Sequence, residues 1–220
     1  MSAATWDAAM DDLHRAPFTD DCLGETLRIG GVSREGLWLE FGVYKGGSLR
    51  RLAEARGDAD VYGFDSFDGL PADWRSGYPK GAFELPSDRI PLIPGASIIK
   101  GLFADTLPGF LRALHLLDGP RVTFVHVDCD LYSSTKTVLE HCLPYMDHGS
   151  VLVFDELHSY EGCEAHEMRA LKEAYERGLR FNWICRGEQQ ASIRKSAGHP
   201  HRLHRRDPRS AIERAMRVTR

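Results

Sequence analysis

The chain alternates short apolar runs with longer segments in which apolar residues recur at helical spacing. The apolar runs predict strands at residues 37–41, 61–64, 97–100, 122–127, 151–154, 181–185 and 191–194, and the last two are placed to form a closing hairpin. Strands that alternate with helices favour a parallel sheet covered on both faces. The pattern therefore predicts an α/β fold.

The segments between these strands predict helices at residues 48–55, 107–117, 133–145 and 163–177. Pro108 is expected in the first turn of its helix, where its missing amide hydrogen costs little, and Gly178 is expected to end the helix before it. Residues 7–30 also look helical, with an interruption at Pro17. We expect three parts: a helical N-terminal extension (1–36), one α/β domain (37–195) and a basic C-terminal tail (196–220) with a short helix near 208–218.

Residues 66–95 break the alternation of strands and helices. This segment contains five prolines and much glycine, aspartate and serine; the prolines are Pro71, Pro79, Pro86, Pro91 and Pro94. A loop of this length inside a compact domain is unusual and tends to be functional.

Composition narrows the class of protein. Apolar residues make up 42% of the 220, which supports a full core, and no apolar run reaches the length of a membrane span. The N-terminus has no basic region followed by an apolar stretch, so no secretory signal is expected. The five cysteines are odd in number and form no CxxC pair, which favours reduced thiols in a cytoplasmic protein and argues against a zinc site.

The net charge of −4 conceals an uneven distribution. Residues 194–220 hold nine Lys/Arg and two Asp/Glu, a net of +7, so the remainder carries −4 − 7 = −11. A basic tail can bind nucleic acid, but this one lacks aromatic residues for base stacking. We therefore do not expect nucleic acid or a membrane as a partner, while a homo-oligomer is compatible with the sequence.

A glycine-rich turn follows the first predicted strand. Residues 40–48 have the form E-x-G-x-x-x-G-x-S, which is neither GxGxxG nor a P-loop. Glycines there let the backbone approach a ligand closely. Glu40 would repel a pyrophosphate but suits a positively charged amino group, which weighs against NAD and toward S-adenosylmethionine.

Asp65 lies 18 residues beyond Gly47, at the end of the second predicted strand. An acid in that position typically accepts hydrogen bonds from ribose hydroxyls, and Phe67 could lie against an adenine ring. The simpler alternatives are a tight turn for the glycines and a helix cap for Asp65.

Two acidic clusters follow later strands. Asp128 and Asp130 bracket the end of the fourth strand, and Asp155 and Glu156 follow the fifth. In a parallel sheet both clusters can face one crevice, where the carboxylates repel one another unless a cation is present. Two or three carboxylates plus water are a typical ligand set for Mg²⁺, and a metal can bind adjacent hydroxyls and lower the pKa of one. The alternative is that Asp130 or Asp155 caps a helix.

Several histidines lie near these clusters. His126, inside an apolar strand, is expected to be hydrogen-bonded rather than catalytic. His158 follows the second cluster and could serve as a general base or outer metal ligand. His166 and Glu167, on the next predicted helix, are weaker candidates.

Five sequence blocks resemble, in order, the macrocin-type sugar O-methyltransferases, which are metal-dependent class I enzymes. The blocks are LEFGVYKGGS (39–48), YGFDSFDGLP (62–71), GLFADTLP (101–108), HVDCDLYSST (126–135) and VFDE (153–156). The resemblance implies a Rossmann-like class I fold, a seven-stranded and mostly parallel sheet with helices on both faces. It also implies S-adenosylmethionine and Mg²⁺, and a substrate-covering role for residues 66–95.

The resemblance also assigns residues. Asp128, Asp155 and Glu156 match the metal-holding positions, although the family commonly has aspartate at the last of them. We expect ten residues to bind the cofactor: Glu40, Gly42, Tyr44, Gly46, Ser48, Asp65, Ser66, Phe67, Gly101 and Asp128. Asp128 and His158 are the catalytic candidates.

The sequence thus predicts an S-adenosylmethionine-dependent O-methyltransferase that acts on a hydroxyl of a small sugar or natural-product diol. Two alternatives remain open. One is a catalytically silent methyltransferase-like binding module. The other is an aspartyl-phosphate phosphatase, since Asp128-Cys129-Asp130 has the DxD form, although that motif usually follows the first strand of its sheet.

Overall fold

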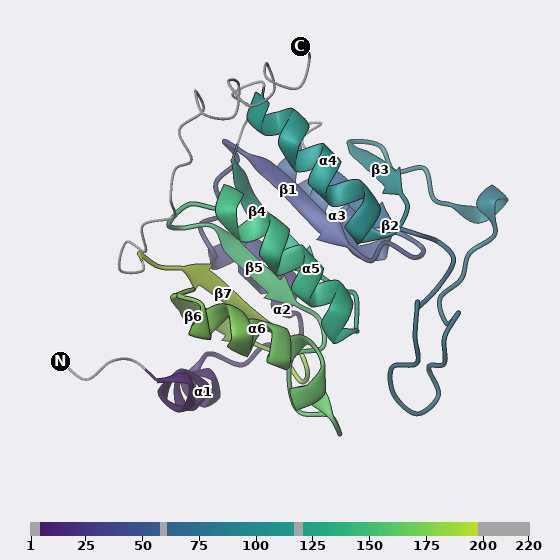
Figure 1. Cartoon of the computed structure of the whole chain (residues 1–220). Coiled ribbons are helices and arrows are strands. Elements are labelled where there is room, and N and C mark those ends of the chain that lie inside the picture. The colour runs from purple at the N-terminus through teal and green to yellow at the C-terminus, as the bar shows by residue number, and fades with distance from the viewer. Residues whose placement is uncertain (1–4, 58–60, 117–120, 198–220) are drawn as a thin grey trace, which may run out of the picture.

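A computed structural model describes residues 5–57, 61–116 and 121–197 of the chain. A seven-stranded sheet with the order β3-β2-β1-β4-β5-β7-β6 runs through its centre (Figure 1). The strands are β1 (Leu37–Phe41), β2 (Val61–Asp65), β3 (Ala96–Lys100), β4 (Val122–Val127), β5 (Val151–Phe154), β6 (Phe181–Arg186) and β7 (Ala191–Lys195). Only β7 runs antiparallel to its neighbours, β5 and β6. The predicted Rossmann-like fold, with its closing hairpin, is confirmed.

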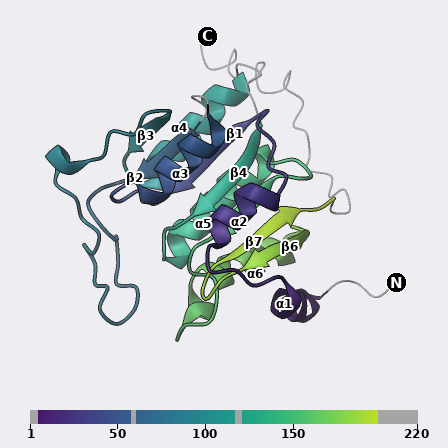
Figure 2. The ribbon, with the colours of Figure 1, turned by 180° about the vertical axis from the view of Figure 1, so that it is seen from behind.

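Helices cover both faces of this sheet. They are α1 (Trp6–Arg15), α2 (Cys22–Ile29), α3 (Gly47–Arg56), α4 (Phe103–Leu116), α5 (Tyr132–Cys142) and α6 (Glu167–Glu176). Helices α4, α5 and α6 pack on the face seen in Figure 1, and α2 and α3 on the face seen in Figure 2. Apolar side chains that these helices bury against the sheet, such as Leu139 and Leu52, contribute about 2 kcal/mol each.

Three helix boundaries differ from the predicted ones by more than one residue. Helix α4 begins at Phe103, so Pro108 lies in its second turn; the carbonyl that Pro108 cannot bond belongs to Ala104, which is exposed to water. Helix α5 ends at Cys142 and continues as a 3₁₀ turn, Leu143–Tyr145, which contains a proline. Residues 163–177 divide into a 3₁₀ turn, Cys163–Ala165, and helix α6, because the backbone at His166 is not helical.

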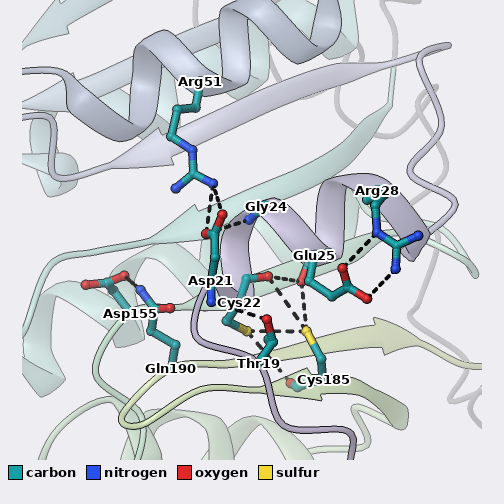
Figure 3. A network of polar contacts seen from close by, with 11 residues as sticks. Thr19, Asp21, Cys22, Gly24, Glu25, Arg28, Arg51, Asp155, Cys185 and Gln190 are labelled. Atoms are coloured by element: carbon teal, nitrogen blue, oxygen red, sulfur yellow. Dashed lines mark hydrogen bonds and ion pairs between the residues drawn. The ribbon is translucent and has the colours of Figure 1, made fainter.

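The N-terminal residues form two separate helices, as the interruption at Pro17 predicted. Helix α2 is held to the sheet by polar contacts as well as apolar ones (Figure 3). Asp21 accepts a hydrogen bond from the Gly24 amide and pairs with Arg51 of α3. The Cys22 and Cys185 thiols lie 3.5 Å apart, and all five cysteines are free thiols.

The structure bears only in part on the predictions about membrane spans, the terminal helix and the domain limits. Among the described residues, no helix has the length and apolar character to cross a bilayer. The predicted terminal helix at 208–218 lies outside the described residues. The proposed domain limits stay predictions.

The register of the central strands brings the candidate residues to one edge of the sheet. Phe41 pairs with Val127, and Val127 pairs with Phe154. The residues that follow, Gly42, Asp128 and Asp155, therefore lie next to one another where these strands end. Continuing bonds keep them in line: the Asp128 amide donates to the Phe41 carbonyl and the Asp155 amide to the Val127 carbonyl, each at 2.9 Å.

Gly42 is required by this close alignment. Its φ is +99°, and a Cβ atom there would lie 1.7 Å from the Asp128 carbonyl oxygen. No rotation of a side chain can relieve a contact between Cβ and backbone. The turn after β1 can therefore lie against the end of β4 only because residue 42 has no side chain.

We predict that Gly42→Ala lowers the free energy of unfolding by about 3 kcal/mol or more, because it adds a backbone clash to an unfavourable φ. Gly149→Ala is the matched control: its φ is also positive, at +91°, but a Cβ there meets nothing within 4 Å. We expect that control to lose only about 1 kcal/mol. Urea unfolding monitored by tryptophan fluorescence measures both, and equal losses would contradict the packing argument.

Candidate active site

A cavity of about 440 Å³ opens at the carboxyl edge of the sheet. It is lined by the loops after β1, β2, β3, β4 and β5, where the loop after β2 is the segment 66–95, and by the first turns of α4 and α5. Eight of the residues singled out from the sequence line this cavity: Gly42, Tyr44, Asp65, Ser66, Gly101, Asp128, Asp130 and Glu156. The structure thus brings the glycine turn, the acid after β2 and both acidic clusters to one cavity.

Glu40 lies beneath the glycine turn rather than on the cavity wall. Its side chain is fully buried, and one carboxylate oxygen, Oε1, accepts a short hydrogen bond from the Ser48 hydroxyl at the start of α3. The other oxygen, Oε2, has no hydrogen-bond partner. A buried carboxylate with an unpaired oxygen places negative potential under the turn, which suits a cationic ligand.

Asp65 shapes the glycine turn through its carboxylate. Oδ2 accepts hydrogen bonds from the backbone amides of Val43 and Tyr44, and Oδ1 accepts one from the Phe67 amide, all at 2.8 Å. This arrangement is not a helix cap, so that alternative is wrong. Asp65 also lines the cavity, so a ligand hydroxyl can still reach its carboxylate.

Phe67 and Gly46 occupy supporting positions. Phe67 is 1% exposed and packs in the core rather than on the cavity wall, which corrects the expectation that it lies against an adenine ring. The apolar wall is formed instead by Leu102 and Phe103, at the start of α4. Gly46 precedes α3 with a φ of +74° and does not line the cavity.

Asp128, Asp155 and Glu156 converge. Each offers a carboxylate oxygen, and the three oxygens lie within 4.8 Å of one another. Glu156 Oε2 is buried without a hydrogen-bond partner. Three carboxylates at this spacing, one with an orphaned oxygen, fit a hard divalent cation such as Mg²⁺ or Mn²⁺.

Mutual repulsion perturbs the protonation of this trio. Burial, followed by the charges of Asp155 and Asp128, raises the pKa of Glu156 to about 10. Burial and Asp155 likewise raise the pKa of Asp128 well above its usual range. Burial also acts to raise the pKa of Asp155, but His126 and the Gln190 amide outweigh it and lower that pKa. A cation would replace the protons that otherwise relieve the repulsion.

His126 supplies positive charge inside the sheet. It is fully buried in β4, with Nδ1 3.7 Å from Glu40 Oε1 and Nε2 3.8 Å from Asp155 Oδ1. Both distances exceed a normal hydrogen bond, so the predicted hydrogen bonds of His126 are replaced by longer ion pairs. Burial alone would lower the pKa of the imidazole, yet the two carboxylates raise it well above its usual value.

His158 does not face the cavity. Its Nδ1 lies 2.6 Å from the Ser159 hydroxyl, and its Nε2 lies 3.0 Å from the Gln190 carbonyl oxygen. Burial lowers the pKa of the ring. These contacts engage both nitrogens away from the cavity, which corrects the expectation that His158 serves as a base there.

Asp130 and Asp155 do not cap helices. The residue before α5 is Leu131, without a side-chain cap, and Asp155 bonds instead to Gln190. Asp130 has a φ of +61° and lines the cavity. Burial and the charge of Asp155 raise the pKa of Asp130 to about 7.

Two supporting residues stand out in the structure. Glu167, at the start of α6, is fully buried; its Oε2 accepts a long bond from the Glu156 amide, and its Oε1 is unpaired. Burial, and to a lesser extent the charge of Glu156, raises the pKa of Glu167 well above its usual range. Gln190 donates a short hydrogen bond to Asp155 Oδ1 (Figure 3). Sequence patterns did not single out Gln190, because only the β5–β7 pairing brings it there.

Residues 39–157, which are 119 of the 220, match the family described as a methyltransferase domain. The chain belongs to this family of methyltransferases.

Individual similar proteins share only a modest sequence identity with this chain. A Streptomyces olivaceus enzyme, 8-demethyl-8-(2,3-dimethoxy-alpha-L-rhamnosyl)-tetracenomycin-C 4'-O-methyltransferase, is 28% identical over 170 residues, a match that covers 66% of this chain and 61% of that enzyme. The crystal structure of CalS11, a calicheamicin methyltransferase, aligns with a TM-score of 0.60 at 23% identity, over 86% of this chain and 80% of that one. The O-methyltransferase NovP aligns with a TM-score of 0.55 at 20% identity, over 81% of this chain and 78% of that one. The two structural likenesses show the class I methyltransferase fold.

We predict that Asp65→Ala lowers the free energy of unfolding by roughly 3 kcal/mol, because it removes three backbone-to-carboxylate hydrogen bonds. Asp68→Ala, which removes an exposed acid three residues later, should change it by less than about 0.5 kcal/mol. Urea titration gives both values. A loss for Asp65→Ala no larger than that of the control would show that the carboxylate does not hold the turn.

Proposed function

We propose that this protein is an S-adenosylmethionine-dependent O-methyltransferase that methylates a hydroxyl of a small sugar-bearing or natural-product diol, with a divalent cation held by Asp128, Asp155 and Glu156. The observation that carries the proposal is that one cavity is lined by the glycine turn and by Asp128 and Glu156, whose carboxylates converge with that of Asp155. Membership of the methyltransferase family supports the reaction type.

The charge distribution favours a cationic cofactor. Glu40, with an unpaired buried oxygen, lies below the turn, and Asp65 and Asp128 lie on the cavity wall. S-adenosylmethionine has a positively charged sulfonium and amino group and would supply the methyl group. The turn residues Gly42 and Tyr44, together with Ser66 and Gly101, would contact it; Glu40, Gly46, Ser48 and Phe67 would act from beneath by shaping that wall.

The carboxylate trio suits a cation that also binds the acceptor. A bound divalent cation would offset the repulsion among the three acids and lower the pKa of a coordinated hydroxyl. Asp128 lines the cavity next to Gly42 and also belongs to the carboxylate trio, so its carboxylate would accept the hydroxyl proton. The aligned ends of β1, β4 and β5 would hold the reacting groups in place, which is the main means of acceleration in such a transfer.

The cavity also suits an acceptor with an apolar part. Leu70, Pro71 and Phe83, from the segment 66–95, line it. The Streptomyces relative is named as a methyltransferase for a rhamnosyl group carried by a tetracenomycin. A hydroxylated sugar attached to an apolar natural product would present hydroxyls to the acids and apolar surface to this wall.

We predict that removing divalent cations with EDTA lowers methyl transfer at least about 100-fold and that added Mg²⁺ restores it. Asp128→Ala, Asp155→Asn and Glu156→Gln should each cause a comparable loss, because each removes one carboxylate from the metal site. Transfer of radiolabelled methyl from S-adenosylmethionine to a panel of rhamnosides and catechols measures this activity.

Glu161→Gln is the control for these variants, since it neutralises an exposed acid five residues after Glu156 and should retain activity. Full activity in EDTA would refute the metal role. Tight S-adenosylhomocysteine binding in calorimetry, with no transfer to any acceptor, would instead favour a catalytically silent binding module.

A further inference from the structure

The turn between β6 and β7 lies directly beside the carboxylate trio. Strand β7 runs antiparallel to β5, and Phe154 pairs with Ala191. One step beyond that pair, at the carboxyl end of β5, Asp155 stands opposite Gln190. The register of the two strands therefore places an amide side chain next to one of the three carboxylates.

Gln190 uses this position to bond to Asp155. Its Nε2 donates a short hydrogen bond to Asp155 Oδ1, as Figure 3 shows. The same oxygen lies 3.8 Å from His126 Nε2, beyond hydrogen-bond distance. The Asp155 carboxylate is thus oriented by a hydrogen bond from the Gln190 amide and by the more distant imidazole of His126.

The backbone around Gln190 is itself held in place. Its carbonyl oxygen accepts a hydrogen bond from the Gly187 amide at 2.8 Å and lies 3.0 Å from His158 Nε2. The Gln189 carbonyl accepts bonds from the amides of Leu157 and His158, at 2.8 and 3.2 Å. These contacts bind the turn to the residues that follow Glu156. They also give His158, which does not face the cavity, a structural role in holding this turn.

The neighbouring side chain, Gln189, has a different partner. Its Oε1 accepts a hydrogen bond from Arg75 Nη1 at 3.2 Å. The Arg75 guanidinium lies 3.9 Å from the centre of the Trp74 ring and 4.7 Å from that of Tyr160. Gln189 thus contacts the segment 66–95 and not the acids, although it has the same chemistry and lies in the same turn.

We propose that Gln190 is a positioning residue for the metal site: its amide holds the Asp155 carboxylate in the orientation that converges with Asp128 and Glu156. This inference rests on the proposed metal-dependent function. Groups that hydrogen-bond to metal ligands set the orientation of those ligands, and their loss typically weakens metal binding 10- to 100-fold.

The test measures Mn²⁺ binding to the full chain by electron paramagnetic resonance, without cofactor or acceptor. Gln190→Met keeps the length of the side chain but removes the donor, and Gln190→Asn keeps the amide but shortens its reach. We expect each to weaken Mn²⁺ binding at least about 10-fold. Gln189→Met, the matched control, should stay within about twofold of the wild-type affinity.

A second measurement separates positioning from general support of the fold. S-adenosylhomocysteine binding, followed by calorimetry, should stay within about twofold in both Gln190 variants, because the amide contacts only the metal side of the cavity. A parallel loss of both affinities would overturn the proposal. If Gln190→Met does not fold, Gln190→Asn decides the question alone, since it keeps a polar amide in the turn.

The outcomes also distinguish this inference from the proposed function. A wild-type chain that does not bind Mn²⁺ would overturn both. A wild-type chain that binds Mn²⁺, with folded Gln190 variants that bind it equally well, would overturn only the role of Gln190.

Discussion

The convergence of carboxylates at one edge of the sheet is the constraint on which the site depends. Parallel pairing of β1, β4 and β5 aligns the residues that follow them, so Asp128 and Asp155 cannot separate without breaking the register. Glu156 follows directly, and its carboxylate lies close to both. The free energy of folding therefore holds these three carboxylates together at a partly buried site, where repulsion between negative charges is stronger than in water.

The surrounding residues reduce this repulsion in three ways. His126 places a buried imidazole between Glu40 and Asp155. Gln190 donates to Asp155, and the raised pKa values of Glu156 and Asp128 favour the uncharged form of these two acids. The cationic cofactor and divalent metal of the proposed function would complete the balance. The same charges that oppose folding thus prepare the cavity for cationic ligands.

The glycine turn is held by a residue that was predicted from the sequence to bind the ligand. Asp65 was predicted to bind a ribose because of its place at the end of β2, and the structure shows its carboxylate bonded to three amides of the turn and the following loop. Gly42 is needed because the turn lies against the backbone of Asp128. Phe67 was predicted to contact the ligand, but it packs in the core, at a bend where its φ is +59°.

The sequence by itself determined the strands, the glycine turn and the acidic clusters, because apolar periodicity and the residues that end each strand are local signals. Strands β1, β4 and β5 have the predicted bounds. Only the tertiary structure decided which polar groups meet the acids. Gln190 lies 35 residues from Asp155 and reaches it through antiparallel pairing, which local patterns do not specify. The same packing turns His158 away from the cavity and Asp130 toward it, because side-chain direction at the end of a strand depends on the backbone of the loop and on its neighbours.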